Sequence, residues 1–362
     1  MRLKALVAGM GSAALVLGCQ GPTEPPEAAT FVLEEAYSFP WLPSSDFITQ
    51  FGFDTEGVLW VATFEGAIIR VSEDGEVTSF GVTSVAGGDP LHDLFIDTSN
   101  RVWVAAGASV AAFDGGAWSI VGPPDSRGLS AGVSQVAANA SGEVLLAMGD
   151  AEAGGLMLRH GGSWRTLTPG NSSLPSPLVL SIEVASNGGF WVGSAQFQGR
   201  GGLSLVSGTE IVTVMDTGDG LLYNWIDDLA PVGTRVYAGF AVPIFDSPGV
   251  AEGGIQELSV ADGVIDSWFP FSSGLASNRV LALTYSSSGE LWFTTSIDAD
   301  NAGCDACFSG VGVLTSSGRL EVLSTLNGDV APNEFLPDIA EGPAGVIYVA
   351  RAERHQIMRV VR

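Results

Sequence analysis

Basic side chains are scarce in this sequence. Its 362 residues include 15 lysine and arginine residues against 40 aspartate and glutamate residues, which gives a formal net charge of −25. A surface of this sign repels nucleic-acid phosphates, so nucleic acid is excluded as a partner, and it favours cations or cationic groups. The chain nevertheless contains 9 tryptophan residues, and this aromatic content indicates an ordered apolar core rather than a disordered acidic chain.

Sequence motifs typical of enzymes are also missing. The chain has no HExxH, GxxxxGK or GxGxxG segment, which argues against the metalloproteases and nucleotide-binding enzymes that these motifs define. Carboxylates from separate segments can still meet in space. The absences therefore favour a non-catalytic protein and leave an enzyme as the alternative.

Only three cysteines are present, and the first of them ends an apolar N-terminal segment. The sequence MRLKALVAGMGSAALVLGC has a basic start, an apolar stretch and Cys19, which indicates an export signal rather than a membrane-spanning helix. Its end, Leu-Val-Leu-Gly-Cys, resembles the lipobox of bacterial lipoproteins, which implies lipidation of Cys19. The alternative is an ordinary signal peptide that happens to contain a cysteine.

This N-terminal reading predicts three regions and a location. Residues 1–18 form a lipoprotein signal peptide, residues 19–29 a proline-rich flexible tether, and residues 30–362 one folded domain. The resemblance implies a protein of the cell envelope that is attached to a membrane through its N-terminal lipid. Gln20, rather than an aspartate, follows Cys19, and by resemblance to sorting in Gram-negative bacteria this favours the outer membrane.

One strand pattern recurs seven times along the rest of the chain. The segments are LWVAT at 59–63, VWVAA at 102–106, VLLAM at 144–148, FWVGS at 190–194, VYAGF at 236–240, LWFTT at 291–295 and IYVAR at 347–351. They begin 43, 42, 46, 46, 55 and 56 residues apart, a spacing typical of four strands per repeat. The large side chain in each segment, expected to fill the gap between neighbouring sheets, is Trp60, Trp103, Leu146, Trp191, Tyr237, Trp292 or Tyr348.

The two ends of the chain predict how the repeats close. The last repeat stops after its third strand. Residues 30–38, which come before the first repeat, have the pattern of an outer fourth strand and belong to no other repeat. We therefore predict an all-β fold, a seven-bladed β-propeller of four-stranded antiparallel blades in which the N-terminal strand completes the last blade.

The repeats resemble two propeller families. LWVAT, FWVGS, GLASN at 274–278 and DTEGVLW at 54–60 resemble the two-component-regulator-type propeller repeat, and GELWFTT at 289–295 resembles the streptogramin lyase branch. The second resemblance implies, for an active enzyme, a channel histidine with a metal and a glutamate. His355 with Glu353 or Glu334 is a loose parallel in an unmatched motif context, so no catalytic role is assigned.

Two links between strands, residues 240–254 and 295–312, are longer than a hairpin needs. The second contains Asp298, Asp300 and Asp305, whose spacing begins like a calcium loop, although no acidic residue stands at its twelfth position, Ser309. Calcium is therefore a possible ligand, and a solvated acidic loop is the alternative. Cys304 and Cys307 lack further zinc ligands, and in an exported protein we expect them to form a local disulfide.

The remaining candidate site residues lie on the links that gather around the mouth of a propeller channel, where ligands usually bind. They are polar or aromatic residues that could hold a ligand: Asp46, Asp89, Arg200, Tyr223, Asn224, Asn278, Arg279, Asn333, Glu334, Arg351, Arg354 and His355. Alternatively, these groups bond only to one another and to water. The sequence thus predicts a binding or scaffolding module for a protein, peptide or glycan, with a metal-dependent lyase or lactonase as the alternative.

Overall fold

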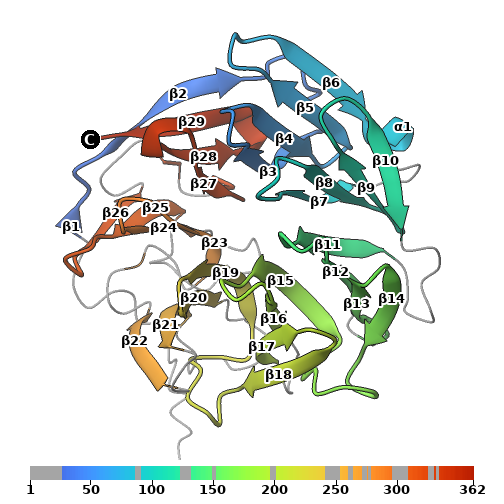
Figure 1. Cartoon of the computed structure of the whole chain (residues 1–362). Coiled ribbons are helices and arrows are strands. Elements are labelled where there is room, and N and C mark those ends of the chain that lie inside the picture. Colours follow the sequence, from blue (N-terminus) through green and yellow to red (C-terminus); the bar gives the residue numbers. More distant parts are fainter. Residues whose placement is uncertain are drawn as a thin grey trace, which may run out of the picture.

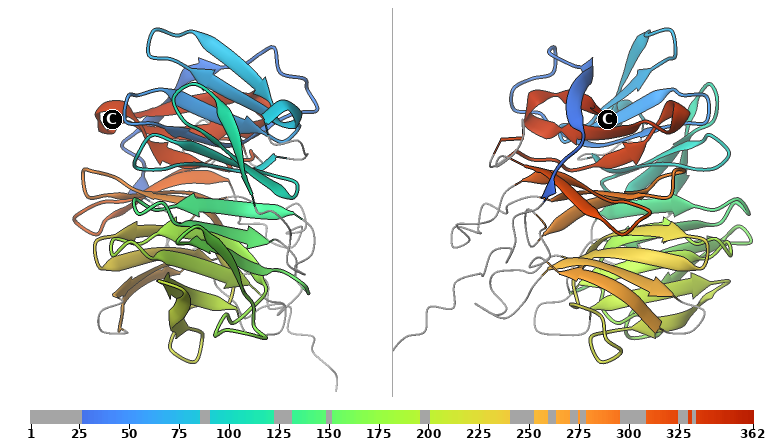
Figure 2. Two further views of the ribbon diagram at one scale, coloured as in Figure 1. Left: turned by 45° about the vertical axis from the view of Figure 1, so that its right-hand side comes forward. Right: turned by 90° about the vertical axis from the view of Figure 1, so that its left-hand side faces the viewer.

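The computed structural model describes residues 27–85, 91–122, 132–148, 152–195, 201–240, 253–259, 264–270, 275, 279–295, 309–324, 330–331 and 334–362. These residues form seven separate sheets arranged around a central axis (Figure 1). Figure 2 shows the same sheets from the side, where they lie as tilted blades around the ring. No helix within these described ranges has the length and apolar character that crossing a membrane requires.

Each blade is built from consecutive strands. The first three blades contain β3 (Ile48–Phe53), β4 (Leu59–Thr63), β5 (Ala67–Val71) and β6 (Val77–Gly81), then β7 (Leu91–Ile96), β8 (Val102–Ala106), β9 (Ser109–Phe113) and β10 (Trp118–Gly122), then β11 (Val133–Ala138), β12 (Val144–Met148), β13 (Gly155–His160) and β14 (Ser163–Leu167). Helix α1 (Val82–Val85) follows the first blade.

The other four blades follow the same order. They contain β15 (Leu178–Val184), β16 (Phe190–Ala195), β17 (Gly202–Ser207) and β18 (Glu210–Met215), then β19 (Ile226–Val232), β20 (Arg235–Phe240), β21 (Gly254–Ser259) and β22 (Val264–Pro270), then β23 (Val280–Tyr285), β24 (Leu291–Thr295), β25 (Gly310–Leu314) and β26 (Leu320–Ser324), then β27 (Ile339–Glu341), β28 (Ile347–Arg351) and β29 (Gln356–Val361). The prediction of seven four-stranded antiparallel blades is confirmed.

The seven recurring segments form the second strand of each blade, and their large side chains fill the spaces between blades. Trp60 is 2% exposed and packs against Leu94 and Val104 of the next blade. Burying such a large apolar side chain stabilises these interfaces. In the third blade the strand register shows that Leu145, not Leu146, holds this position, because Leu146 pairs with Val136 of the inner strand. The predicted alignment was wrong there by one residue.

The N-terminal segment closes the ring as predicted. Strand β2 (Val32–Ser38) pairs antiparallel with β29 and supplies the fourth strand of the last blade. A two-residue strand that the sequence did not indicate, β1 (Glu27–Ala28), pairs in parallel with β26 of the sixth blade, and both strands are visible beside their partners in Figure 1. The segment therefore joins the outer edges of two neighbouring blades.

Candidate functional site: the channel and its loop-bearing mouth

Polar side chains on the inner strands connect each blade to the next around the channel. The inner edge of every β-propeller blade leaves backbone N–H groups without a partner strand. Here Gln50 accepts a hydrogen bond from the backbone N–H of Leu94 at 2.8 Å, and Asp93 accepts one from the backbone N–H of Val136 at 2.6 Å. The Gln50 Nε2 also donates to Asp93 Oδ1 at 2.6 Å.

The same connection recurs on the other side of the channel. Asp228 Oδ2 accepts from the backbone N–H of Leu283 at 2.7 Å, and Asp338 Oδ2 accepts from the backbone N–H of Phe51 at 2.7 Å. Gln135 makes a longer bond of 3.2 Å to the backbone N–H of Ile182. These side chains therefore act as structural links between blades as well as lining the channel.

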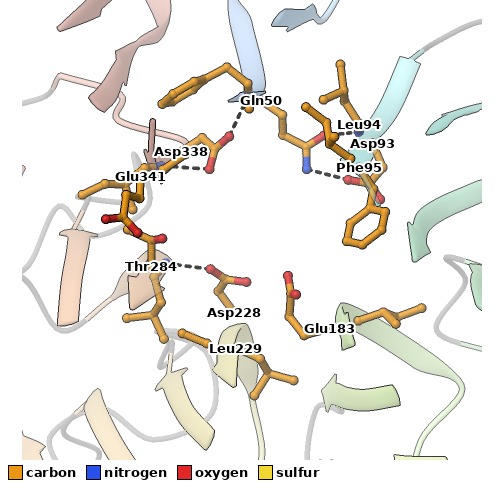
Figure 3. A pocket seen from close by; sticks show the side chains of 18 of the residues that line it. Gln50, Asp93, Leu94, Phe95, Glu183, Asp228, Leu229, Thr284, Asp338 and Glu341 are labelled. Atoms are coloured by element: carbon orange, nitrogen blue, oxygen red, sulfur yellow. Dashed lines mark hydrogen bonds between the residues drawn. The ribbon is translucent and has the colours of Figure 1, made fainter. Parts of the chain in front are cut away.

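The channel is strongly acidic. Its cavity of about 450 Å³ is lined by Asp93, Glu183, Asp228 and Asp338, and their carboxyl groups point toward its open centre (Figure 3). Burial raises the pKa of Asp93 to about 6 and the pKa values of Asp228 and Asp338 to about 7. Partial protonation near neutral pH reduces the repulsion among these groups.

Glu183 differs from its neighbours because no side-chain hydrogen bond ties it to another blade in the described part of the chain. Burial raises its pKa well above the usual range, and the carboxylates of Asp228, Asp93 and Asp338 raise it further. Figure 3 shows its carboxyl group opposite that of Asp228. These carboxyl groups can exchange protons or attract a cation, but across the described ranges no group of three histidine, cysteine, aspartate or glutamate side chains is arranged to hold a metal ion.

Five of the predicted residues come together at the junction of the last and first blades. Glu334 Oε1 lies 2.8 Å from the Arg351 Nε and 2.9 Å from the Arg354 Nε. His355 Nε2 lies 2.8 Å from the backbone carbonyl of Asp46, and Asp46 Oδ1 accepts the backbone N–H groups of Phe47 and Glu65. Most of these polar groups thus hold the links of the two blades in place. We refer to Glu334, Arg351, Arg354, His355 and Asp46 as the Glu334 cluster.

The two arginines that pair with Glu334 should contribute differently to the stability of the fold. Arg351 is buried, whereas the Arg354 side chain is 51% exposed. Replacing Arg351 by alanine should reduce the free energy of unfolding by about 2 kcal/mol, because a buried carboxylate keeps only one partner. Arg354→Ala is the control and should cost less than about 1 kcal/mol. Urea denaturation measures both; equal losses would contradict the structural role of Arg351.

Three other predicted residues lie elsewhere on the ring: Arg279 at the junction of the fifth and sixth blades, and Tyr223 and Asn224 on the link between the fourth and fifth blades. The Arg279 Nε forms an ion pair of 2.8 Å with Asp227 Oδ2, and Trp225 Nε1 donates to the other oxygen of Asp227 at 2.8 Å. Asn224 Oδ1 accepts the backbone N–H of Thr217 at 3.1 Å, and Tyr223 is half-buried next to it. The structure does not bring this group together with the Glu334 cluster.

The remaining predicted site residues fall outside the described ranges. They are the lipidation site Cys19, the ligand candidates Asp89, Arg200, Asn278 and Asn333, the cysteines Cys304 and Cys307, and the calcium candidates Asp298, Asp300 and Asp305. The long links at 240–254 and 295–312 also lie largely outside them. The predictions for these positions stay predictions.

Sequence reasoning missed an exposed aromatic group on the mouth that carries the Glu334 cluster. Phe64 is 49% exposed and its ring is stacked on that of Phe47, with centroids 4.7 Å apart and an angle of 13°. Phe335, next to Glu334, meets Phe47 edge-on at 6.1 Å. We refer to Phe47, Phe64 and Phe335 as the aromatic platform.

Sequence reasoning also missed the acidic channel, although a signal was present. The inner-strand position of Gln50 is polar in the next four blades, with Asp93, Gln135, Ser181 and Asp228 at the corresponding register. Aligning the inner strands rather than the second strands would have shown this series. The predicted candidates were placed at the strand starts instead, nearer the mouth.

The fold and the polar channel define the class of this protein as a seven-bladed β-propeller. No family model matches the chain. No curated protein sequence matches it either.

Solved structures share the fold at low sequence identity. One is the extracellular domain of a putative hybrid two-component system from B. thetaiotaomicron, with 14% identity, a TM-score of 0.65 and coverage of 93% of this chain and 41% of that one. The chain thus corresponds to less than half of that protein. Virginiamycin B lyase from Staphylococcus aureus is 15% identical, with a TM-score of 0.66 and coverage of 92% and 99%. At these identities the likeness establishes the fold.

Proposed function

We propose that this protein is an exported, lipid-anchored β-propeller that binds a protein or peptide partner and does not catalyse a reaction. The observation that carries the proposal is the exposed aromatic platform beside Arg354 on the mouth of the channel. An extracellular sensor domain and a lyase are both among the proteins that share the fold, so the fold alone does not choose between binding and catalysis.

The mouth presents the side chains that dominate protein interfaces. Phe64 exposes about half of its surface, and Trp41, in the link that leads to Phe47, is 53% exposed. The Arg354 side chain is 51% exposed although it pairs with Glu334. Aromatic residues and arginine are the usual centres of binding energy in protein interfaces. A rigid stacked pair also loses little entropy on binding, because its rings are already held in place.

Charge favours a basic partner. The net charge of −25 attracts positively charged surfaces and accelerates their association. A lipid on Cys19 would hold the propeller at a membrane, and residues 20–26 would separate it from the bilayer. We therefore expect the partner to carry basic residues around a hydrophobic contact with the aromatic platform.

The geometry at His355 argues against the alternative of a metal-dependent lyase or lactonase. The resemblance to the lyase branch pointed to His355 and Glu334, but His355 is 9% exposed and its Nε2 faces the backbone carbonyl of Asp46. Glu334 is held by Arg351 and Arg354. Both side chains are used for structure, and neither is placed to hold a metal with the other.

The test is capture from a membrane extract of the source organism on immobilised protein. We expect a protein that the unmodified chain retains, and replacing Phe64 by alanine should reduce its recovery roughly tenfold. Ile120→Ala is the matched control, because Ile120 is 65% exposed on the outer strand β10, and it should leave recovery unchanged.

Three outcomes of this experiment would contradict the proposal. Equal recovery on the unmodified protein and Phe64→Ala would remove the aromatic platform from the interface. Capture that survives protease treatment but not glycosidase treatment would assign a glycan instead of a protein. Turnover of a substrate by the purified protein would favour the enzyme.

A further inference from the structure

A cavity with aromatic walls lies at the junction of the last and first blades, on the face opposite the aromatic platform. Its volume is about 610 Å³, and it is formed by the turns after β3, β5 and β27 together with side chains of β2 and β28. Three rings, those of Tyr37, Phe53 and Tyr348, stand in its wall. The predicted and proposed binding residues above lie on the other face.

The three rings pack against one another at inclined angles rather than stacking flat. The Phe53 and Tyr348 centroids are 4.6 Å apart at 44°, and Tyr37 lies 6.3 Å from each of them at 49° and 44°. All three side chains are half-buried, and all three line the cavity. Because the rings are inclined to one another, a small cation in the cavity can lie over more than one π face, and ammonium cations bind to such faces.

The rim of the cavity is acidic. Glu56 and Glu73 are exposed on it, and Asp54 and Glu341 stand beside them. Asp54 is engaged by the backbone N–H groups of Glu56 and Val58, and Glu341 by Ser287. Two carboxylates with a solvent-facing position thus remain at the entrance, and no lysine or arginine is among the residues that line the cavity.

The corresponding rings of two other blades each have a cation over them. The guanidinium of Arg70 lies 5.8 Å from the centroid of Trp60, and that of Arg362 lies 5.2 Å from the centroid of Trp292. Trp60 and Trp292 hold the repeat position of Tyr348. Next to Tyr348, Arg359 forms an ion pair with Glu34 at 2.8 Å and does not line the cavity.

We propose that this cavity binds a quaternary ammonium group of a small molecule, with Tyr37, Phe53 and Tyr348 around the cation and the Glu56 and Glu73 carboxylates at the entrance. The charge of the group meets the π faces, and its methyl groups fill the apolar interior. A carboxylate or phosphate on the same ligand would be repelled by the rim, so free choline should bind better than phosphocholine.

Calorimetric titration of the full chain with choline tests this site. We expect saturable binding of choline with a dissociation constant in the millimolar range or below, roughly what a few cation–π contacts provide. Dimethylbutanol, in which carbon replaces the ammonium nitrogen, has the same shape without the charge and should bind at least roughly tenfold more weakly. Equal binding of the two compounds, or no saturable binding of choline, would overturn the proposal.

Variants separate this site from loss of folding. Tyr37→Leu should weaken choline binding roughly tenfold, and Tyr37→Phe should retain it because the π face remains. Glu73→Gln changes only an exposed rim residue and should weaken binding a few-fold. The control is Tyr285→Leu, at the repeat position of Phe53 in the sixth blade, where Tyr285 stacks on Tyr237 at 13°.

Tighter binding of phosphocholine than of choline would assign the site to a phosphocholine headgroup, against the acidic rim. None of these results depends on the partner of the aromatic platform.

Discussion

Replacing Phe31 by alanine should lower the free energy of unfolding by about 3–5 kcal/mol, the usual cost of removing a large buried aromatic side chain. Phe31 is 2% exposed and its ring meets Trp292 edge-on with centroids 5.1 Å apart. The contact joins the N-terminal segment to the interface between the sixth and seventh blades. Chemical denaturation of the two proteins measures the difference.

The neighbouring residue supplies the control for this experiment. Val32 is 52% exposed, so Val32→Ala should change the free energy of unfolding by less than about 0.5 kcal/mol. The hydrogen bonds from the backbone N–H and side-chain hydroxyl of Thr30 to Glu321 are retained in both variants. A loss below about 1 kcal/mol for Phe31→Ala would mean that the N-terminal segment does not help to close the ring.

Neutralising the two facing carboxyl groups of the channel should stabilise the protein at high pH. The pKa of Asp228 is raised from 3.8 to about 7, and the pKa of Glu183 is raised well above its usual value. A raised carboxyl pKa gives a stability contribution that is complete below the unfolded pKa and lost as the pH rises through the folded pKa. For Asp228 this window runs from about pH 4 to about pH 7.

The expected size follows from the same shift. Three pKa units correspond to about 4 kcal/mol, and about 2 kcal/mol is a better expectation because these side chains are only half-buried in the channel. The double variant Glu183→Gln, Asp228→Asn should therefore unfold at a higher temperature than the unmodified protein at pH 8. At pH 4 the two proteins should differ little, because the raised pKa values leave the Glu183 and Asp228 carboxyl groups largely neutral in the unmodified protein.

An exposed carboxylate is the control for the channel. Asp114 has a side chain that is 78% exposed, and Asp114→Asn should leave the melting temperature within about 1 °C at both pH values. It removes one negative charge from the surface without touching the channel. If it stabilised the protein at pH 8 as much as the double variant, general repulsion of the acidic surface would explain the effect.

The sequence predicted the blades because their pattern is local. A large ring at a fixed position in each second strand, as in Trp60 and Trp103, and Asp-Gly turns between alternating strands depend on neighbours in the chain. The missing last strand of the seventh repeat predicted the role of β2 directly. The pairing of β1 with β26 was not predictable, because two residues carry no periodic signal.

The site was predicted only in part, because its residues meet across distant segments. The candidates Asp46, Glu334, Arg351, Arg354 and His355 do converge on one junction, since strand order places their links together. The sequence could not show that they would mostly bind one another. Phe64 gave no signal, because a single exposed phenylalanine in a short link has no recognisable pattern and its stacking on Phe47 exists only in the folded chain.

Hydrogen–deuterium exchange of the protein with and without its captured partner tests the proposed function most directly. Binding at the aromatic platform should slow exchange at residues 41–47, 64–65, 335 and 352–355. It should leave β10 and β18 unchanged, although both expose large apolar side chains, Ile120 and Val212. Slower exchange confined to those outer strands, with no change at Phe64 and Phe47, would contradict the account.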